Sequence, residues 1–271
     1  MNAGNIKKMH VKYFDENQNI LEEIQYHLPI GNEKVHMNAL IGKKIQFVYE
    51  GLINCVVCAK KTKSSFGQGS CYSCFMNAPQ NAPCILKPEL CQAHLGKGRD
   101  VVWENTNHNK EHIVYLAKSS AIKIGVTGDF PLTRWIDQGA SEAILLAKVP
   151  YRQLAGEIEV LLKDYYTDKT NWRRMLKNEI STIDLIEEKE NCYEYLPEEY
   201  HEFIDETDEV FTINFPTKEY PKSIKSVGFD KVPIIESTLK GIKGQYLFLE
   251  NNQVLNMRKH TGYYLSLNVL N

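Results

Sequence analysis

The pattern of apolar and polar positions predicts strands at both ends of the chain and a mixed αβ block between them. Near the beginning, residues 45–50 and 52–57 are apolar runs on either side of Gly51. Short apolar runs separated by a glycine are typical of a hairpin. We therefore expect residues 1–54 to be β-rich and the second of these strands to run into a cysteine pair.

The end of the chain shows the same strand pattern. Residues 245–249 and 254–257 are apolar runs that flank Asn251 and Asn252, and a further apolar run covers 263–269. Asparagine adopts turn conformations with little strain, so the two asparagines mark a turn. We expect a hairpin followed by one more strand.

Between these ends the pattern alternates between strands and helices. Residues 113–117 and 122–126 predict two short strands. Pro131 then occupies a position suited to a first helical turn, and the helix that it begins should end at Gly139. Residues 143–149 predict a third strand.

The clearest helix is predicted over residues 151–166, because its apolar side chains recur with the helical period. These side chains are Leu154, Ile158, Leu161, Leu162 and Tyr165. They predict the face that packs on the core. Residues 179–209 then hold thirteen acidic side chains against one base, Lys189, which indicates a solvated helical connection.

Composition excludes several classes of protein. The hydrophobic share of 43% and the charged share of 24% are close to the averages of globular proteins and unlike those of disordered or fibrous chains. A length of 271 residues suggests two or three compact units. The net charge of -2 provides no overall attraction to nucleic acid, so any anion site must be local.

Targeting signals are not evident in the sequence. No stretch approaches the roughly 20 apolar residues of a membrane-spanning helix, and residues 1–13 lack the apolar run of a secretory signal. We therefore expect a cytoplasmic protein with no membrane partner. Thiols stay reduced in that compartment, so clustered cysteines favour a metal site over disulfides.

Six of the seven cysteines fall between Cys55 and Cys91. Cys55 and Cys58 form one CxxC pair, and Cys71 and Cys74 form another after twelve intervening residues. Two such pairs can surround a tetrahedral zinc ion with four thiolates and leave no position open for a substrate. We predict one structural zinc ion at these four cysteines. The alternatives are four buried cysteines without metal, or a redox pair.

A second group of metal-ligand residues follows. It contains Cys84, Cys91 and His94, with His108 or His112 as a fourth donor. Thiolate and imidazole donors of this kind suit a second zinc ion. The alternative is that these are loop residues around the first site.

Four short motifs lie on successive elements of the αβ block. They are Ile113-Val-Tyr115 on the first strand, Lys123-Ile-Gly125 on the second strand, Arg134 in the next helix and Glu159 in the later helix. Through these motifs and their order, residues 112–170 resemble the GIY-YIG nuclease superfamily, and more closely a variant that reads V-Y, K-I-G, R and E-x-x-L. The resemblance implies a small antiparallel sheet flanked by helices.

The same resemblance implies hydrolysis of a phosphodiester. Tyr115 would receive the proton of the nucleophile, Arg134 would stabilise the transferring phosphate, and Glu159 would hold a magnesium or manganese ion. The first glycine of the superfamily motif is Ile113 here, and its second tyrosine is Lys123. An ammonium can contact phosphate but cannot repeat the acid–base role of a phenol, so we predict that Lys123 contacts phosphate.

Each of these residues also has a purely structural interpretation. Tyr115 could simply pack within its strand, and Arg134 could form a surface ion pair. Its sequence neighbours for such a pair are Asp129 and Asp137. In the later helix, Glu157 and Glu159 lie on either side of the apolar stripe, so periodicity does not choose between them and only the motif selects Glu159.

Longer stretches carry a second resemblance. They are Cys84-Ile-Leu-Lys-Pro-Glu-Leu-Cys91, Val114-Tyr-Leu-Ala117, Arg134-Trp-Ile-Asp-Gln-Gly-Ala140 and Asp168-Lys-Thr-Asn-Trp-Arg173. Through them the whole chain is similar to a bacterial family, domain of unknown function 2797. This second resemblance implies no activity by itself.

Local basic residues point to a nucleic-acid partner. Around the cysteine pairs these residues are Lys60, Lys61, Lys63, Lys87, Lys97 and Arg99, against Glu89 and Asp100. Near the end of the chain they are Lys240, Lys243, Arg258 and Lys259, which alternate with aromatic residues. Alternating basic and aromatic side chains suit phosphate contact and base stacking.

These predictions combine into an α+β protein of five consecutive segments. The segments are a β-rich part (1–54), a zinc-ribbon-like module (55–110), a GIY-YIG-like domain (111–178), an acidic helical connection (179–212) and a β-rich end (213–271). The leading hypothesis is a zinc-containing protein that binds DNA or RNA and cleaves it with a divalent metal. The alternative is a non-catalytic adaptor that binds nucleic acid or protein through a degenerate GIY-YIG-like fold.

Overall fold

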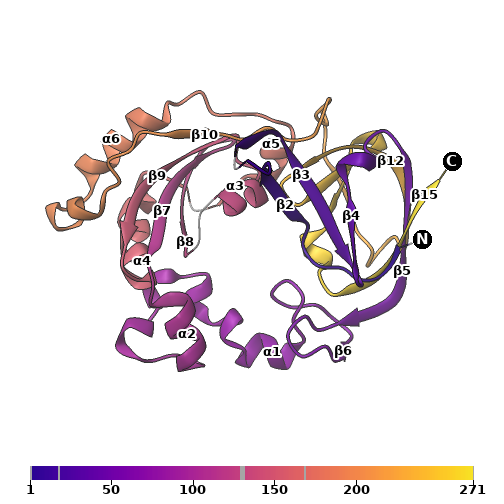
Figure 1. Ribbon diagram of the computed structural model, residues 1–271, viewed down its shortest axis with the longest axis horizontal. Helices are drawn as coiled ribbons and strands as arrows, with labels where there is room; N and C mark the ends of the chain where they lie inside the picture. The colour runs from indigo at the N-terminus through magenta and orange to yellow at the C-terminus, as the bar shows by residue number, and fades with distance from the viewer. Residues whose placement is uncertain (1, 18, 129–131, 168, 271) are drawn as a thin grey trace. The chain divides into compact units, whose positions relative to one another are not determined.

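A computed structural model of the chain describes almost all of its residues (Figure 1). The described ranges are 2–17, 19–128, 132–167 and 169–270. Asp129, Pro131 and Asp168, which entered the sequence analysis, lie outside these ranges. Within them, no helix combines the length and the apolar character needed to cross a membrane.

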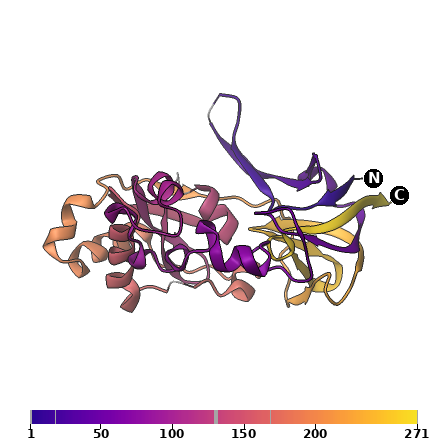
Figure 2. The same ribbon diagram turned by 90° about the horizontal axis from the view of Figure 1, so that it is seen from below.

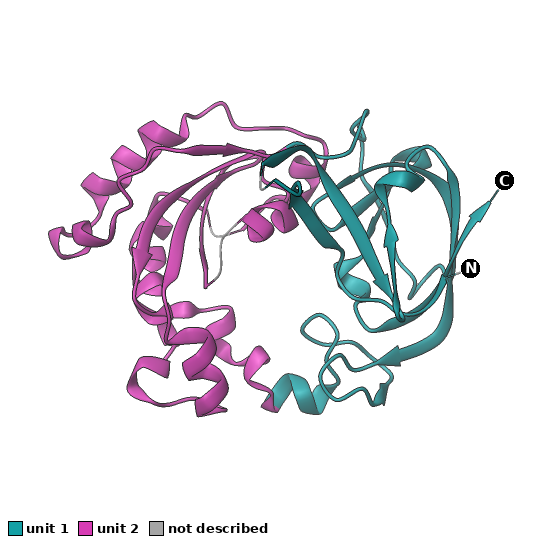
Figure 3. Cartoon of the chain, in the orientation of Figure 1, with its two compact units in different colours: residues 1–76, 214–271 teal, residues 77–213 magenta. Residues whose placement is uncertain are grey.

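The chain forms two compact units (Figure 3). Unit 1 combines residues 1–76 with 214–271, and unit 2 is the continuous stretch 77–213. This division differs from five consecutive segments, because strands from the two ends of the chain pair with each other. In unit 1, β5 (Lys44–Asn54) lies between β12 (Ile234–Lys243) and β15 (Tyr263–Leu270).

Among its described residues, unit 1 contains an eight-stranded and a three-stranded sheet. The larger sheet has the order β1-β15-β5-β12-β13-β14-β11, with β6 paired to β5, and the smaller has the order β2-β3-β4. The other elements are β1 (Asn2–Asn5), β2 (His10–Phe14), β3 (Ile20–Ile30), β4 (Glu33–His36), β6 (Lys61–Thr62), α1 (Tyr72–Asn77), β11 (Lys225–Val227), β13 (Tyr246–Leu249) and β14 (Gln253–Asn256). The β2–β3 hairpin, dark indigo in Figure 2, extends away from the other strands of this unit.

The expected hairpin around Gly51 is wrong, because β5 runs through this position as one strand. Gly51 has a φ of 73°. It lies where the register between β5 and β15 shifts, opposite the step from Tyr263 to Leu265. A glycine in the left-handed region permits a bulge without reversing the chain. The hairpin expected near the end is confirmed, since β13 and β14 are joined through Asn251 and Asn252.

Unit 2 is built on a four-stranded antiparallel sheet with the order β10-β9-β7-β8 (Figure 1). Its helices and strands are α2 (Val101–His108), β7 (His112–Lys118), β8 (Ile122–Thr127), α3 (Leu132–Gln138), β9 (Glu142–Val149), α4 (Arg152–Leu161), α5 (Trp172–Leu176), α6 (Leu185–Tyr195) and β10 (Val210–Thr212). The three strands predicted in this region are therefore confirmed, as is the helix that ends before Gly139. Together the units have the α+β character expected from the sequence.

The predicted helix at 151–166 ends earlier than its apolar pattern. After α4, a 3₁₀ turn covers Leu162–Asp164. A 3₁₀ turn has three residues per turn, so the stripe no longer follows one face. Leu161 and Tyr165 are 37% and 54% exposed, and Tyr165 stacks on Tyr195 with ring centroids 3.8 Å apart. The stripe residues that pack on the core are Leu154, Ile158 and Leu162.

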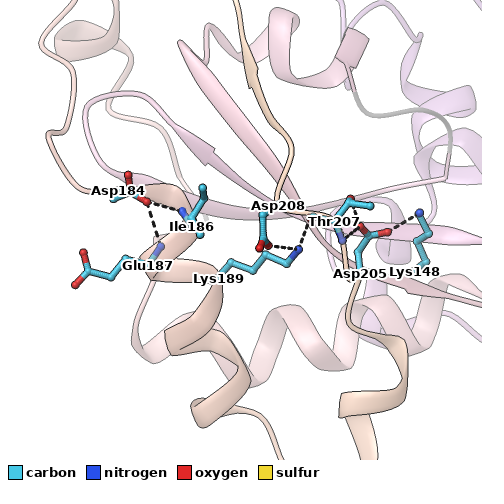
Figure 4. A network of polar contacts seen from close by, with 8 residues as sticks. All are labelled: Lys148, Asp184, Ile186, Glu187, Lys189, Asp205, Thr207 and Asp208. Atoms are coloured by element: carbon cyan, nitrogen blue, oxygen red, sulfur yellow. Dashed lines mark hydrogen bonds and ion pairs between the residues drawn. The ribbon is translucent and has the colours of Figure 1, made fainter.

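The acidic segment at 179–209 packs onto the sheet of unit 2 instead of forming a solvated connection. Its buried core residues are Leu185, Cys192 and Leu196. Lys189 is 5% exposed and pairs with Asp208 at 3.2 Å. Asp205 pairs with Lys148 of β9 at 2.5 Å (Figure 4). The segment therefore belongs to the fold of unit 2.

Candidate functional site

Cys55, Cys58, Cys71 and Cys74 come together in unit 1. Their sulfur atoms all lie within 4.8 Å of one another, and those of Cys58 and Cys71 are 3.9 Å apart. Zinc–sulfur bonds of about 2.3 Å in a tetrahedron place two sulfurs roughly 3.8 Å apart. The four thiols therefore fit the zinc ion that the sequence predicts at this place.

Tight turns of the backbone orient these thiols. Ala59 has a φ of 60° and donates a hydrogen bond to the carbonyl oxygen of Cys55 at 2.8 Å, directly after the first pair. Burial raises the pKa of Cys55, but backbone N–H groups of Cys58 and Cys71 outweigh it and lower that pKa to about 6. In the same cluster, burial and hydrogen bonds with the other three thiols raise the pKa of Cys74 to about 12. Metal binding must therefore displace the protons that these thiols still hold.

Cys84, Cys91 and His108 form a second cluster, which belongs to unit 2. The three donor atoms lie within 4.8 Å of one another. Nδ1 of His108 is 3.5 Å from the sulfur of Cys91 and 3.9 Å from that of Cys84. His108, one of the two histidines expected as a fourth donor, is the last residue of α2. His94, expected beside the two cysteines, is not part of this cluster, and its ring stacks on Tyr151 with centroids 4.5 Å apart.

His112, the other histidine considered for this cluster, is placed differently. Its Nδ1 lies 2.8 Å from the carbonyl oxygen of Lys110. Its Nε2 faces Gly128, where an added Cβ would lie only 2.8 Å away. Burial lowers the pKa of His112 to about 4, so the ring is neutral at physiological pH. It is not a member of the cluster.

Tyr115, Lys123, Arg134 and Glu159 line one pocket in unit 2. They come from β7, β8, α3 and α4, and the pocket has a volume of about 550 Å³. Among the described residues, this lining holds six cationic side chains and a single carboxylate, that of Glu159. The cations are Lys87, Lys123, Arg134, Arg152, Lys163 and Lys169. Such a lining attracts an anion.

The side chain of Tyr115 packs directly over Gly125, the glycine of the Lys-Ile-Gly motif. It pairs in register with Gly125, and a Cβ at Gly125 would stand 2.6 Å from the Tyr115 hydroxyl. That hydroxyl donates a hydrogen bond to Oε1 of Gln138 at 3.3 Å. Burial raises the pKa of Tyr115, and nearby Arg134 only partly opposes this. The phenol therefore stays protonated at neutral pH.

Glu159 lines the pocket, whereas Glu157 lies on the other side of α4. Glu157 accepts a hydrogen bond from Nε2 of Gln153, one turn earlier. Ile158, between the two glutamates, is buried in the core. Of the two glutamates that periodicity could not separate, the one that lines the pocket is the motif residue.

Four cations of this pocket were not predicted to belong to it, and they are Arg152, Lys163, Lys87 and Lys169. Lys87 was counted only among the basic residues near the cysteine pairs. Two of the four cations had a signal, since one face of α4 and its extension carries a second stripe at helical spacing. That stripe is Arg152, Gly156, Glu159 and Lys163. Lys87 and Lys169 lie outside helices and strands, where periodicity gives no signal.

The basic residues counted from the sequence are divided between the units. Exposed lysines beside the first cysteine cluster belong to unit 1, and they are Lys60, Lys61 and Lys63. The others belong to unit 2, and they are Lys87, Lys97 and Arg99. Near the end of the chain, Lys243 is only 1% exposed. It therefore cannot make the phosphate contact that its sequence pattern suggested.

The fold and these clusters define a class: an α+β protein that carries a four-cysteine site fit for zinc and a cation-lined pocket. More particularly, the chain belongs to the family described as Protein of unknown function (DUF2797), whose model matches residues 42–265. This confirms the family resemblance seen in the sequence. No curated protein and no solved structure matches the chain.

Proposed function

We propose that the pocket of unit 2 binds the phosphodiester backbone of a nucleic acid and cleaves it with a divalent metal ion. One observation carries this proposal. Tyr115, Lys123, Arg134 and Glu159 were selected only through resemblance to GIY-YIG nucleases, and they line one pocket although they come from four elements. Four residues without a common function would not be expected to line one pocket.

The cations of the pocket suit a phosphate substrate. The planar guanidinium of Arg134 matches two phosphate oxygens, and the ammonium of Lys123 supplies a further point charge. The interactions of both cations with the phosphate become stronger in the transition state, because the phosphate oxygens gain negative charge as the phosphorus becomes pentacoordinate. Lys60, Lys61 and Lys63 of unit 1 are proposed as further contacts to the nucleic-acid backbone.

Glu159 is the residue that would hold a magnesium or manganese ion. The donor set fits, because one carboxylate together with waters and phosphate oxygens is an ordinary magnesium site. The ion would supply positive charge against the leaving oxygen. Arg134 and Lys123 would then orient the phosphate and neutralise its remaining charge.

Tyr115 has a narrower role than the resemblance implies. Its pKa is raised by burial, and its proton is directed toward the amide oxygen of Gln138, which does not take up protons at neutral pH. The side chain is fully buried, and its hydroxyl interacts with Arg134 as well as Gln138. We assign to Tyr115 the positioning of the Arg134 guanidinium against the phosphate, while the attacking water gives its proton to solvent.

The alternative function is recognition of nucleic acid without cleavage. Lys123 replaces the second tyrosine of the superfamily, and Tyr115 stays protonated. Among the described residues that line the pocket, neither a histidine nor a second carboxylate offers a general base. These observations favour binding, and the experiment must therefore measure binding and cleavage together.

The test uses the full chain with labelled DNA and RNA oligonucleotides, single- and double-stranded, with and without magnesium or manganese. Binding that weakens as salt rises is expected, because it depends on phosphate contacts. Cleavage that requires the added metal supports the proposal. Binding without cleavage would establish the alternative, and the absence of both would overturn the assignment of the pocket.

A further inference from the structure

The second cysteine cluster has the geometry of a metal site. Zinc bonds of about 2.3 Å to sulfur and 2.0–2.1 Å to nitrogen place tetrahedral sulfur and nitrogen donors roughly 3.6 Å apart. The separations from Nδ1 of His108 are 3.5 Å to Cys91 and 3.9 Å to Cys84. All three residues are buried, so solvent does not compete for their donor atoms.

The segment around this cluster has very little core of its own. Its buried apolar cluster consists of Ala82, Cys84, Cys91 and Ala93, with Ile85 packed beside it. Its larger apolar side chains are exposed, Leu86 at 88%, Leu90 at 54% and Leu95 at 58%. In small metal-binding modules with little core of their own, the bound metal supplies much of the folding free energy.

We propose that Cys84, Cys91 and His108 bind a second zinc ion. Two thiolates and one imidazole are ordinary zinc ligands, and they leave one position of the tetrahedron for a water molecule. The ring nitrogens of His94 are not among the donor atoms that come together here.

The second zinc ion would hold one wall of the pocket. Arg152 donates from Nε to the carbonyl oxygen of Cys84 at 3.1 Å and from Nη2 to that of Ile85 at 3.1 Å. Arg152, Ile85 and Pro88 all line the pocket. Zinc bound at Cys84 fixes these carbonyl groups, and they in turn hold the guanidinium toward the anion. This consequence rests on the proposed function, whereas the metal site itself does not.

The metal site is tested by elemental analysis of the full chain purified without chelator. We expect about two zinc ions per chain, one for each cluster. The double variant Cys84→Ser/Cys91→Ser should keep about one, and the matched variant Cys55→Ser/Cys58→Ser should also keep about one. Wild-type protein with a single zinc ion that persists in Cys84→Ser/Cys91→Ser would overturn the second site.

Variants of the histidines test the ligand set where the cysteine variants fail to fold. His108→Ala should lose the second zinc ion to a weak chelator at least about tenfold faster than wild type. His112→Ala is the control, since its ring is not part of the cluster. A His108→Ala protein that keeps its zinc as long as wild type would overturn the ligand set.

Binding of a short fluorescein-labelled oligodeoxythymidylate tests the link to the pocket. His108→Ala should weaken binding roughly tenfold, about as much as Arg152→Ala, although His108 does not line the pocket. If Arg152→Ala weakens binding and His108→Ala loses zinc without any effect on binding, the link is wrong. If wild-type protein holds two zinc ions and does not bind the oligonucleotide, the proposed function fails while the metal site stands.

Discussion

The backbone of Glu89 lies directly against Gly156 of α4, so that a Cβ on residue 156 would stand 2.1 Å from the amide nitrogen of Glu89. The carbonyl carbon of Pro88 would be 2.5 Å from the same atom. Backbone cannot move aside as a flexible side chain can. The loop between Cys84 and Cys91 can therefore pack this closely on α4 only because residue 156 has no side chain.

We expect Gly156→Ala to destabilise the protein by roughly 1–3 kcal/mol, as overpacking does. Alanine favours a helix over glycine by up to about 1 kcal/mol, so the clash and the helical preference oppose each other and the clash is the larger. Chemical denaturation measures the change. Val160→Ala, at a position 42% exposed on the same helix, is the control and should change little. A Gly156→Ala protein more stable than wild type would show that the loop moves freely.

The two glutamates of α4 provide a paired test of cleavage. Glu159→Ala should lower the rate with magnesium by roughly 10²-fold or more, because it removes the carboxylate proposed to hold the ion. Glu157→Ala should have little effect, since its side chain bonds Gln153 away from the pocket. Rates on one labelled substrate measure both. Equal losses in the two variants would contradict the assignment of Glu159.

The pH dependence of cleavage distinguishes the two roles of Tyr115. Its folded pKa lies above the ordinary value of 10.0, so the phenol remains protonated throughout neutral and mildly alkaline solution. We expect Tyr115→Phe to lower the rate roughly tenfold, because the hydroxyl that interacts with Arg134 is lost. The ratio of wild-type to variant rates should stay constant between about pH 7 and 9. If the ratio instead rises about tenfold for each unit of increasing pH, Tyr115 acts as a phenolate base.

Local pattern predicted much of unit 2 and less of unit 1. Gly139 has a φ of 73° and ends α3 where the sequence predicts the end. A glycine in the left-handed conformation commonly terminates a helix, and this depends only on neighbouring residues. Gly51 has the same φ, but it forms a bulge within β5 and not the predicted turn. A glycine in this conformation serves a turn or a bulge equally well. Pairing of β5 with β15 decides between them, and those strands lie at opposite ends of the chain.

The candidate sites show the same limit. The spacing of the CxxC pairs was sufficient for the four-cysteine cluster, because each pair is local. In the second cluster His94 and His108 were equivalent by residue type, and only the path of α2 brings His108 to the cysteines. Arg152 was missed as a site residue because its partners are carbonyl oxygens, those of Cys84 and Ile85. Every residue has such a group, so sequence cannot single them out.

Lys243 of unit 1 is a buried ammonium group outside the two cysteine clusters and the cation-lined pocket. It is 1% exposed, and its Nζ lies 5.2 Å from the ring centroids of Phe215 and Tyr220. Burial lowers the pKa of Lys243 from 10.5 to about 8. The charged form is thus disfavoured in the folded state relative to the unfolded state, and a shift of this size corresponds to roughly 3 kcal/mol.

We expect Lys243→Met to be more stable than wild type near neutral pH, by an amount that falls as pH rises. Below a pH of about 8 both states of the wild type carry the charge, so the cost of burying it is present in full. Between that pH and 10.5 the folded state loses its proton while the unfolded state keeps it, so wild-type stability gains on the variant. Denaturation of both proteins across this range measures the difference, and ionisation of the tyrosines affects both equally. Lys240→Met, at an exposed position on the same strand, should show a constant difference. A constant difference for Lys243→Met as well would mean that its ammonium is not desolvated in the folded protein.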